Sequence, residues 1–97
     1  MKVIQIALED NVAVALSSIT AGEIVEVGDQ YSVEVLEDIP QGHKIALKDI
    51  TKEENIIKYG FAIGHATVGI KAGNWVYIHY KGNLVAAADG NTATADG

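Results

Sequence analysis

The stretch Lys44-Ile45-Ala46-Leu47-Lys48-Asp49-Ile50 decides the fold class of this chain. Side chains alternate along it, with Ile45 and Leu47 on one side and the two lysines on the other. A period of two is that of a half-buried β-strand, whereas a helix would repeat its apolar residues every three or four positions. The stretch therefore predicts a strand with one face in a core.

The same alternation recurs on both sides of this stretch, in short runs separated by Gly, Asp or Asn. We expect further strands over 4–8, 12–16, 23–27, 31–36, 56–59 and 74–80. In the first two runs, the residues expected to share one face are Ile4, Ile6 and Leu8, and then Val12, Val14 and Leu16. The runs 23–27 and 31–36 are joined by three residues that include Gly28, which is a hairpin length. The pattern predicts a small all-β domain of short strands, with tight turns and little helix.

One spaced pattern occurs three times, as Ala15-x3-Ile19-x5-Val25, Ala46-x3-Ile50-x5-Ile56 and Ala66-x3-Ile70-x5-Val76. We interpret each copy as a corner between two strands, in which the isoleucine fills the corner. The copies are offset by 31 and 20 residues, so the pattern does not describe a solenoid, and a chance match of common residues is the alternative.

Composition narrows the classes of function. The chain has 97 residues, with 13 acidic side chains against 7 lysines and a formal charge of −6. A negative chain with scattered lysines opposes the counterion release that drives nucleic-acid binding, so we exclude nucleic acid as a partner. One domain of this size does not supply two lobes that enclose a substrate, so we expect a module rather than a complete enzyme.

Two residue types are missing, and both absences bear on chemistry. Without cysteine, disulfides and thiolate chemistry are excluded. Without arginine, an anion must be bound by lysine, histidine or backbone N–H groups. The chain reaches Glu9 and Asp10 before a signal-peptide stretch or a membrane span is complete, so we expect a cytoplasmic protein with no membrane partner.

The segment 58–81 is the most chemically dense, with five of the six aromatic residues, two of the three histidines and three lysines. Along the expected strand 74–80, Trp75, Tyr77 and His79 share one face, opposite two β-branched residues that suit a core. That face is then directed to solvent, a ligand or a partner. The alternative is that it forms an amphipathic part of a small core.

Several blocks that occur in order carry a family resemblance: residues 10–16, 39–50, 57–60, 63–67 and 73–76. Together they resemble the small N-terminal SAF-type domain of the altronate/galactarate dehydratase family of hydro-lyases. The resemblance spans residues 10–80. It implies a compact β-clip fold, shared with type III antifreeze proteins and the C-terminal domain of sialic acid synthases. We expect this SAF domain to occupy residues 1–82, with a C-terminal extension over 83–97.

The resemblance also implies a role beside a much larger catalytic region that dehydrates hexonic or hexaric sugar acids. Our first hypothesis is a small subunit or separated N-terminal domain that helps to bind the substrate carboxylate next to a large catalytic subunit. A close alternative is the small subunit of a sulfolactate sulfo-lyase-like enzyme, in which sulfite is the leaving group. The other alternative is a stand-alone SAF module that binds carbohydrate or protein without catalysis.

Three residues fall in blocks that match the family and carry a basic side chain. His43 and Lys44 belong to the Gly-His-Lys block, and Lys58 belongs to the Lys-Tyr-Gly block. We interpret all three as substrate-binding residues. The alternative for His43 is a loop imidazole that bonds to nearby backbone, and the alternative for Lys58 is a solvated strand lysine.

The family usually carries Trp-Val-His-x-His-Asn where this chain has Trp75-Val76-Tyr77-Ile78-His79-Tyr80. Only the second histidine is retained, and the phenol that replaces the first is protonated at neutral pH and ligates divalent ions poorly. We therefore expect this chain to bind no metal alone, and the resemblance implies iron(II) or another divalent metal in the large partner. His79 remains the candidate catalytic residue.

Two further expectations follow. An overall charge of −6 repels an anionic substrate unless cations are locally concentrated, so His79 should converge on one rim with the three substrate-binding residues. Trp75 and Tyr77 should form an interface that self-associates when the partner is missing. Asp10 and Asp49, in contrast, are interpreted as turn or corner residues, and His65 as a surface residue.

Overall fold

The computed structural model describes the backbone of residues 2–29, 31–81 and 84–88, and the side chains of those residues up to Val76. All regular elements in this part of the chain are strands, which confirms the all-β class. They are β1 (Val3–Ile4), β2 (Val12–Ala15), β3 (Ile24–Val27), β4 (Tyr31–Glu34), β5 (Lys44–Ala46), β6 (Asn55–Lys58), β7 (Phe61–Ala66), β8 (Trp75–Lys81) and β9 (Leu84–Ala88). Among the described residues, none forms a helix of the length and apolarity needed to cross a lipid bilayer.

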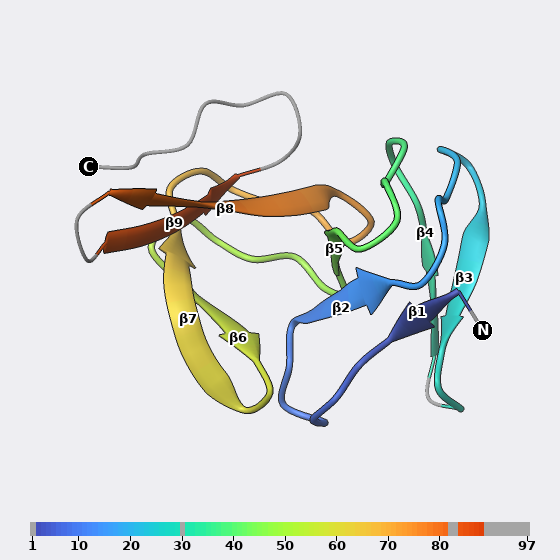
Figure 1. The fold of residues 1–97 in the computed structure, drawn as a ribbon, viewed down its shortest axis with the longest axis horizontal. Coiled ribbons are helices and arrows are strands. Elements are labelled where there is room, and N and C mark those ends of the chain that lie inside the picture. Colours follow the sequence, from blue (N-terminus) through green and yellow to red (C-terminus); the bar gives the residue numbers. More distant parts are fainter. Residues whose placement is uncertain (1, 30, 82–83, 89–97) are drawn as a thin grey trace.

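The strands form a seven-stranded sheet, in the order β1-β2-β5-β8-β9-β7-β6, and a separate hairpin of β3 and β4. The pair β7–β9 is parallel, and the other described pairs are antiparallel. Figure 1 shows the hairpin β3–β4 at one end of the molecule, β6 and β7 at the other, and β2, β5 and β8 between them. The short strand β5 is central because it pairs with both β2 and β8.

Four corners of one backbone shape connect the strands. We name them corner 1 (19–23), corner 2 (39–43), corner 3 (50–54) and corner 4 (70–74). Each begins with a buried isoleucine, and in each the fifth residue donates its N–H to the carbonyl of the second at 2.9–3.1 Å. The fourth residue has a positive φ, as a type II turn requires. These fourth residues are Gly22 (φ 94°), Gly42 (85°), Glu53 (76°) and Gly73 (93°).

The corners are locked together in pairs by their isoleucines. Ile19 and Ile39 exchange backbone hydrogen bonds of 2.9 and 2.8 Å, and Ile50 and Ile70 exchange two of 2.8 Å. All four side chains are fully buried, which contributes about 1.5–3 kcal/mol of transfer free energy each. The isoleucine that fills each corner thus also joins it to its partner.

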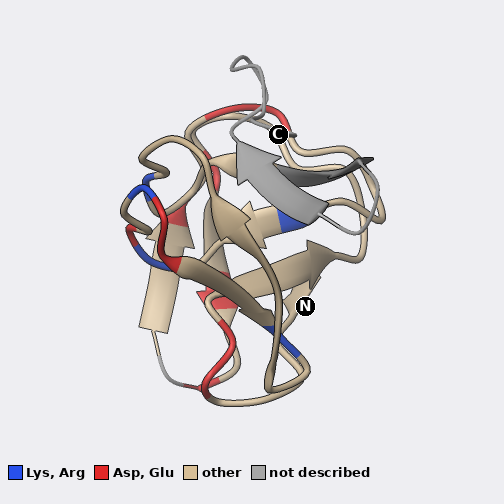
Figure 2. Cartoon of the chain, turned by 90° about the vertical axis from the view of Figure 1, so that its left-hand side faces the viewer, with Lys and Arg blue, Asp and Glu red and all other residues tan. Residues whose placement is uncertain are grey.

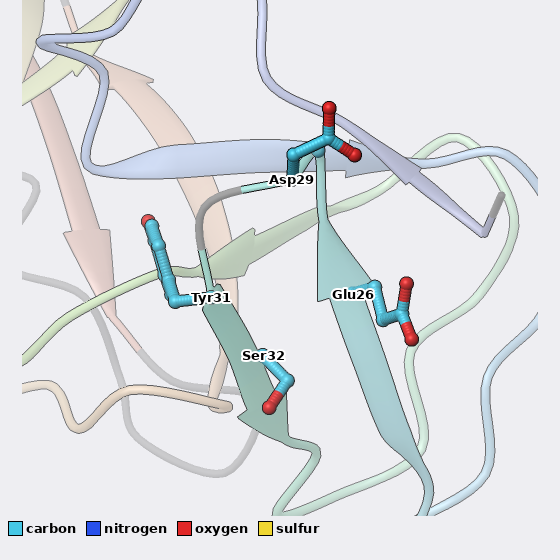
Figure 3. Close-up of a pocket in the computed structure, with 5 residues that line it drawn as sticks. Glu26, Asp29, Tyr31 and Ser32 are labelled. Carbon is cyan, nitrogen blue, oxygen red and sulfur yellow. The ribbon is translucent and has the colours of Figure 1, made fainter.

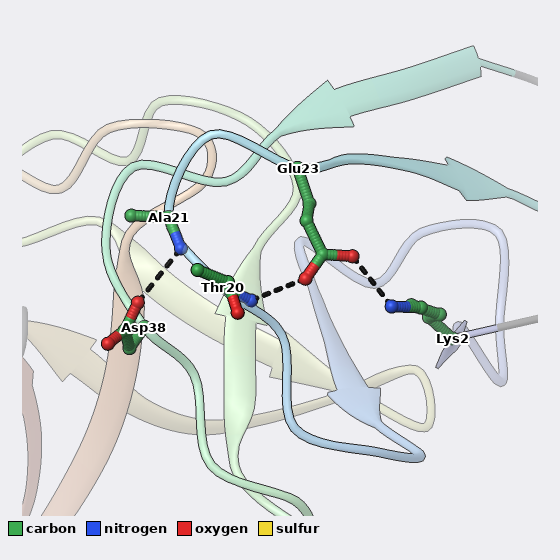
Figure 4. A network of polar contacts seen from close by, with 5 residues as sticks. All are labelled: Lys2, Thr20, Ala21, Glu23 and Asp38. Carbon is green, nitrogen blue, oxygen red and sulfur yellow. Dashed lines mark hydrogen bonds and ion pairs between the residues drawn. The ribbon is translucent and has the colours of Figure 1, made fainter.

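Side-chain oxygen atoms complete the corners. In corner 1 the Glu23 carboxylate accepts the Thr20 N–H at 2.6 Å, and the Asp38 carboxylate accepts the Ala21 N–H at 2.9 Å (Figure 4). The second contact crosses from one corner of the pair to the other. In the second pair, Asp49, which immediately precedes corner 3, accepts the N–H of Ala72 in corner 4 at 2.9 Å, as expected of a residue that supports a corner.

The two corner pairs define two similar units, which we name unit 1 (15–45) and unit 2 (46–76). Ile19 and Ile50 are 31 residues apart, and so are Ile39 and Ile70. Unit 1 encloses the hairpin β3–β4, and unit 2 encloses β6–β7. The three predicted corners are confirmed, and the structure adds a fourth at Val35-x3-Ile39-x5-Ile45, where valine replaces the leading alanine.

Each unit has its own apolar cluster, and the strands between them serve both. The first cluster includes the isoleucines of corners 1 and 2, and the second those of corners 3 and 4. Strand β5 gives Ile45 to the first cluster and Ala46 to the second, while β2 gives Ala13 to the first and Val12 to the second. The sheet of β2 and β5 is therefore covered on both faces.

The structure corrects the predicted faces of the first two strands. In the first run Val3 is the buried residue, whereas Ile6 and Leu8 are 52% and 80% exposed, because the chain leaves the sheet after Ile4. Leu16 is likewise exposed at the end of β2. A strand with both faces buried, such as β2, also does not show the simple alternation of solvent-exposed and buried residues. The strands β7 and β9 were not predicted.

Candidate functional site

Lys44 and Lys58 lie on strands far apart in sequence, yet near enough for the charge of Lys58 to act on Lys44. Lys44 lies in β5 opposite Val14 on one side and Val76 on the other, and Lys58 ends β6. Both side chains are half-buried. Burial, and then the positive charge of Lys58, lower the pKa of Lys44 below its usual value. The ammonium of Lys58 also lies 4.6 Å from the centre of the Tyr59 ring, in a cation–π contact.

The two amines have no carboxylate partner within the described residues. The ion pair found there joins Lys2 and Glu23 at 2.6 Å, beside corner 1 (Figure 4). Acidic positions are spread over several segments of the chain and do not gather at one point (Figure 2). Among the described side chains these two cations repel each other and have no acidic partner, in a chain of charge −6. An anion bound beside them would relieve that repulsion.

Asn11 positions the strand that carries Lys58. Its side-chain oxygen accepts the N–H of Ile57 at 2.7 Å, and its amide donates to the carbonyl of Asn55 at 2.9 Å. The Asn11 side chain thus bonds to β6 as a neighbouring strand would. Because Asn11 immediately precedes β2, these contacts bring β6 against the strand next to Lys44.

Asp10 holds the turn that follows Lys58. The residue is 1% exposed, and its carboxylate accepts the N–H groups of Gly60 at 2.8 Å and of Tyr59 and Ala7 at 3.0 Å each. Burial raises the pKa of Asp10, but these backbone donors outweigh it, and the pKa lies below its ordinary value. Asp10 was interpreted as a turn residue. It also binds the distant turn at Tyr59 and Gly60. In the sequence, the one signal for this contact is that Asp10 lies just before a strand.

His43 and Trp75 form a second group. The indole Nε1–H of Trp75 donates to His43 Nδ1 at 3.2 Å, and the two rings meet edge to face with centres 5.2 Å apart. The Glu37 carboxylate accepts the backbone N–H of Trp75 at 3.0 Å and an amide hydrogen of Asn74 at 3.1 Å. Trp75 also packs partly on the first apolar cluster. The indole is thus held from several sides.

The predicted substrate-binding residues are therefore divided between the two faces of one strand. Lys44 shares its face with Ala46, in the second cluster, whereas His43 and Ile45 take the other face, toward the first cluster and Trp75. The structure brings Lys44 to Lys58 and His43 to Trp75. The side chains of Tyr77 and His79 lie outside the described part of the chain, so the convergence of His79 with the others stays a prediction.

The remaining features do not add to this site. Among the described residues, no group of three or more His, Asp or Glu side chains is arranged to hold a metal ion. His65 is half-buried in β7 and not a fully exposed surface residue. A hollow of about 370 Å³ lies at the tip of β3–β4, lined by Glu26, Gly28, Asp29, Tyr31 and Ser32 (Figure 3). Its two carboxylates would repel an acid.

The described residues form a small all-β domain of two similar units. Residues 1–83 match the SAF domain of altronate/galactarate dehydratase, and the chain belongs to this family.

Curated proteins show the same relationship. The chain is 45% identical over 76 residues to altronate dehydratase of Bacillus subtilis and 47% identical over 79 residues to that of Escherichia coli. These matches cover 78% and 81% of this chain but 15% and 16% of those proteins, so the chain spans about one sixth of their length. It is also 35% identical over 71 residues to the (2R)-sulfolactate sulfo-lyase subunit alpha of Chromohalobacter salexigens, covering 68% of this chain and 76% of that subunit.

Proposed function

We propose that this chain is the accessory domain of a hydro-lyase that acts on a sugar acid of the altronate or galactarate type. In this proposal Lys44 and Lys58 bind a substrate carboxylate beside a larger catalytic region. The observation that carries it is that Lys44 and Lys58 are both half-buried, that the charge of Lys58 acts on Lys44, and that neither has a carboxylate partner among the described residues. A carboxylate bound beside them would compensate their charge.

The chemistry explains why such a lysine pair is useful. Removal of water beta to a carboxylate begins with abstraction of the proton next to that carboxylate, which leaves an enediolate with added negative charge. Two ammonium groups on the carboxylate stabilise this charge as it develops. The described residues present no ligand set for a divalent metal. In this proposal the metal, iron(II) or another divalent ion, and most of the acid–base groups belong to the partner region, in the cytoplasm.

The specific alternative is the small subunit of a sulfo-lyase. It is supported by the match to subunit alpha of the sulfolactate enzyme, of which the chain covers 76%, compared with about one sixth of the altronate dehydratases. The carboxylate site would serve the same purpose with sulfite as the leaving group. A stand-alone binding module is the remaining alternative.

Affinity capture from the native source decides between these proposals. A tagged chain should retain a large hydro-lyase region, and the captured complex should turn over altronate, galactarate or sulfolactate, whereas the chain alone should turn over none. The variant Lys44→Met/Lys58→Met should raise the KM for that acid at least tenfold, while Lys52→Met/Lys71→Met, which removes two exposed lysines, should not. Turnover by the chain alone, or an equal effect of both variants, would overturn the carboxylate role.

Two subsidiary expectations belong to the same complex. His79→Ala should reduce turnover without unfolding the domain. The chain without its partner should self-associate through Trp75 and Tyr77, and Trp75→Ser should reduce that association in analytical ultracentrifugation. A strictly monomeric wild-type chain would exclude the interface.

A further inference from the structure

The fifth residue of a corner has a fixed task in three of the four corners. Glu23, Glu54 and Asn74 each return a side-chain oxygen to the N–H of the second residue of the same corner, at 2.6, 2.9 and 2.8 Å. This bond satisfies a backbone donor that the turn would otherwise leave to water. The second residues are Thr20, Thr51 and Lys71, which all carry an N–H group.

Corner 2 departs from this rule at both positions. Its second residue is Pro40, which has no N–H, and its fifth residue is His43. The backbone otherwise matches, since His43 donates its own N–H to the Pro40 carbonyl at 3.1 Å and Gly42 has the same positive φ as Gly22 and Gly73. Because proline has no backbone N–H, the fifth side chain of corner 2 cannot accept the bond made in the other corners, and the imidazole makes no such bond within the turn.

The imidazole of His43 is nevertheless held in one orientation. The indole N–H can only donate, so the bond from Trp75 Nε1 requires a lone pair on His43 Nδ1. The ring proton of the tautomer that accepts this bond lies on Nε2. Trp75 is itself anchored by the Glu37 carboxylate and the first apolar cluster. The residue His43 remains exposed, so a ligand can approach its side chain.

We propose that His43 is a ligand-binding residue that presents an Nε2–H donor to a hydroxyl or carboxylate oxygen of a sugar acid bound on its own face of the sheet, and that Trp75 is the positioning residue that fixes this tautomer. The identity of the ligand rests on the proposed function, whereas the tautomer does not. On this assignment the chain offers two kinds of recognition on opposite faces of β5. The lysine pair binds negative charge, and His43 donates one directed hydrogen bond.

The tautomer is tested without any ligand. A long-range ¹H–¹⁵N spectrum of the chain at neutral pH should show His43 in the Nε2–H form, and Trp75→Phe should convert it to a mixture of tautomers. The imidazole of His65, which makes no hydrogen bond with a described residue, is the control in the same spectra. Backbone amide spectra establish that the variant is folded. A mixed His43 in the wild type, or an unchanged His43 in Trp75→Phe, would overturn the positioning role.

The ligand-binding role is tested by titration with galactarate. The His43 Nε2 resonance should shift as the acid is added. His43→Gln, which keeps an N–H donor near the same place, should bind it within threefold of wild type, and His43→Leu should bind at least tenfold more weakly. A response of the Lys44 and Lys58 ammonium groups without one from His43 would overturn this inference and leave the proposed function standing. No response from any of the three would overturn both.

Discussion

Corner 2 and corner 4 occupy equivalent places in the two units and share almost the whole of their backbone geometry. Both begin with a buried isoleucine and have glycine as the fourth residue, with φ of 85° and 93°. Their second and fifth residues differ in role, because corner 4 has Lys71 with its N–H bound by Asn74, and corner 2 has Pro40 with His43 turned outward to Trp75. The side chain of the fifth residue thus stabilises the turn in corner 4, whereas in corner 2 it makes its contact outside the turn.

The largest expected effect separates the two glycines. A Cβ on Gly73 would collide with the backbone carbonyl of Glu34, whereas Gly42 has nothing within 4 Å of that place. Gly42→Ala should cost about 1–2 kcal/mol of unfolding free energy from its positive φ alone. Gly73→Ala should cost about 2–5 kcal/mol, since overpacking adds to that strain. Urea denaturation measures both, and equal costs would show that corner 4 is no more tightly packed than corner 2.

A second prediction concerns the hairpin turns of the two units. The turn of unit 2 is clamped by Asp10, so Asp10→Asn, which replaces a charged acceptor by an amide, should cost about 1.5–3 kcal/mol. The folded pKa of Asp10 is lowered, so its contribution is complete above the unfolded pKa of about 3.9 and is lost as the pH falls through the lower folded value.

Urea denaturation at pH 6 and near pH 3 tests whether the stabilisation by Asp10 is lost as the pH falls. The wild type should lose more stability between the two than Asp10→Asn does. Glu23, whose pKa is also lowered, contributes equally to both proteins and cancels from the comparison. The same pH dependence in both proteins would remove Asp10 as its source.

The smallest effect tests the rule of the corners directly. Pro40→Lys/His43→Asn gives corner 2 the second and fifth residues of corner 4, and the side-chain oxygen of the introduced asparagine should then accept the restored N–H. The coupling free energy of the two changes in a double-mutant cycle should be about 0.5–2 kcal/mol and stabilising, as for other side-chain caps. His43→Asn alone should gain nothing, because Pro40 offers no donor. A coupling of zero would mean that proline and histidine occur together without a structural reason.

The parts of this fold that were predictable are those decided by local pattern. The hairpin of 23–27 and 31–36 is confirmed by the register of Val25 with Val33, and the spacing of Ala and Ile located three of the four corners. The fourth was missed because Val35 replaces alanine, which left offsets of 31 and 20 residues without a common period. Both offsets are real, the first between units and the second between the corners of one pair.

The candidate site was less predictable because it depends on distant contacts. His43 and Lys44 take opposite faces, as strand alternation requires, whereas the net charge of −6 predicts that both lie on one rim. The approach of Lys58 to Lys44 depends on Asn11, which bonds to residues 44 and 46 positions later in the chain. No local pattern around Lys58 indicates that contact.

The pairing of the corners also sets an order for folding. Each corner pair closes a loop of 20 residues, and the contacts of Asp10 and Asn11 with β6 and its turn close loops of 44 to 50 residues. Closing the longer loop costs about 0.8 kcal/mol more in chain entropy if it is formed first. We expect the two units to form early and largely separately, and the bonds from Asp10 and Asn11 to form last. Since those bonds bring Lys58 to Lys44, the lysine pair would be the final part of the molecule to assemble.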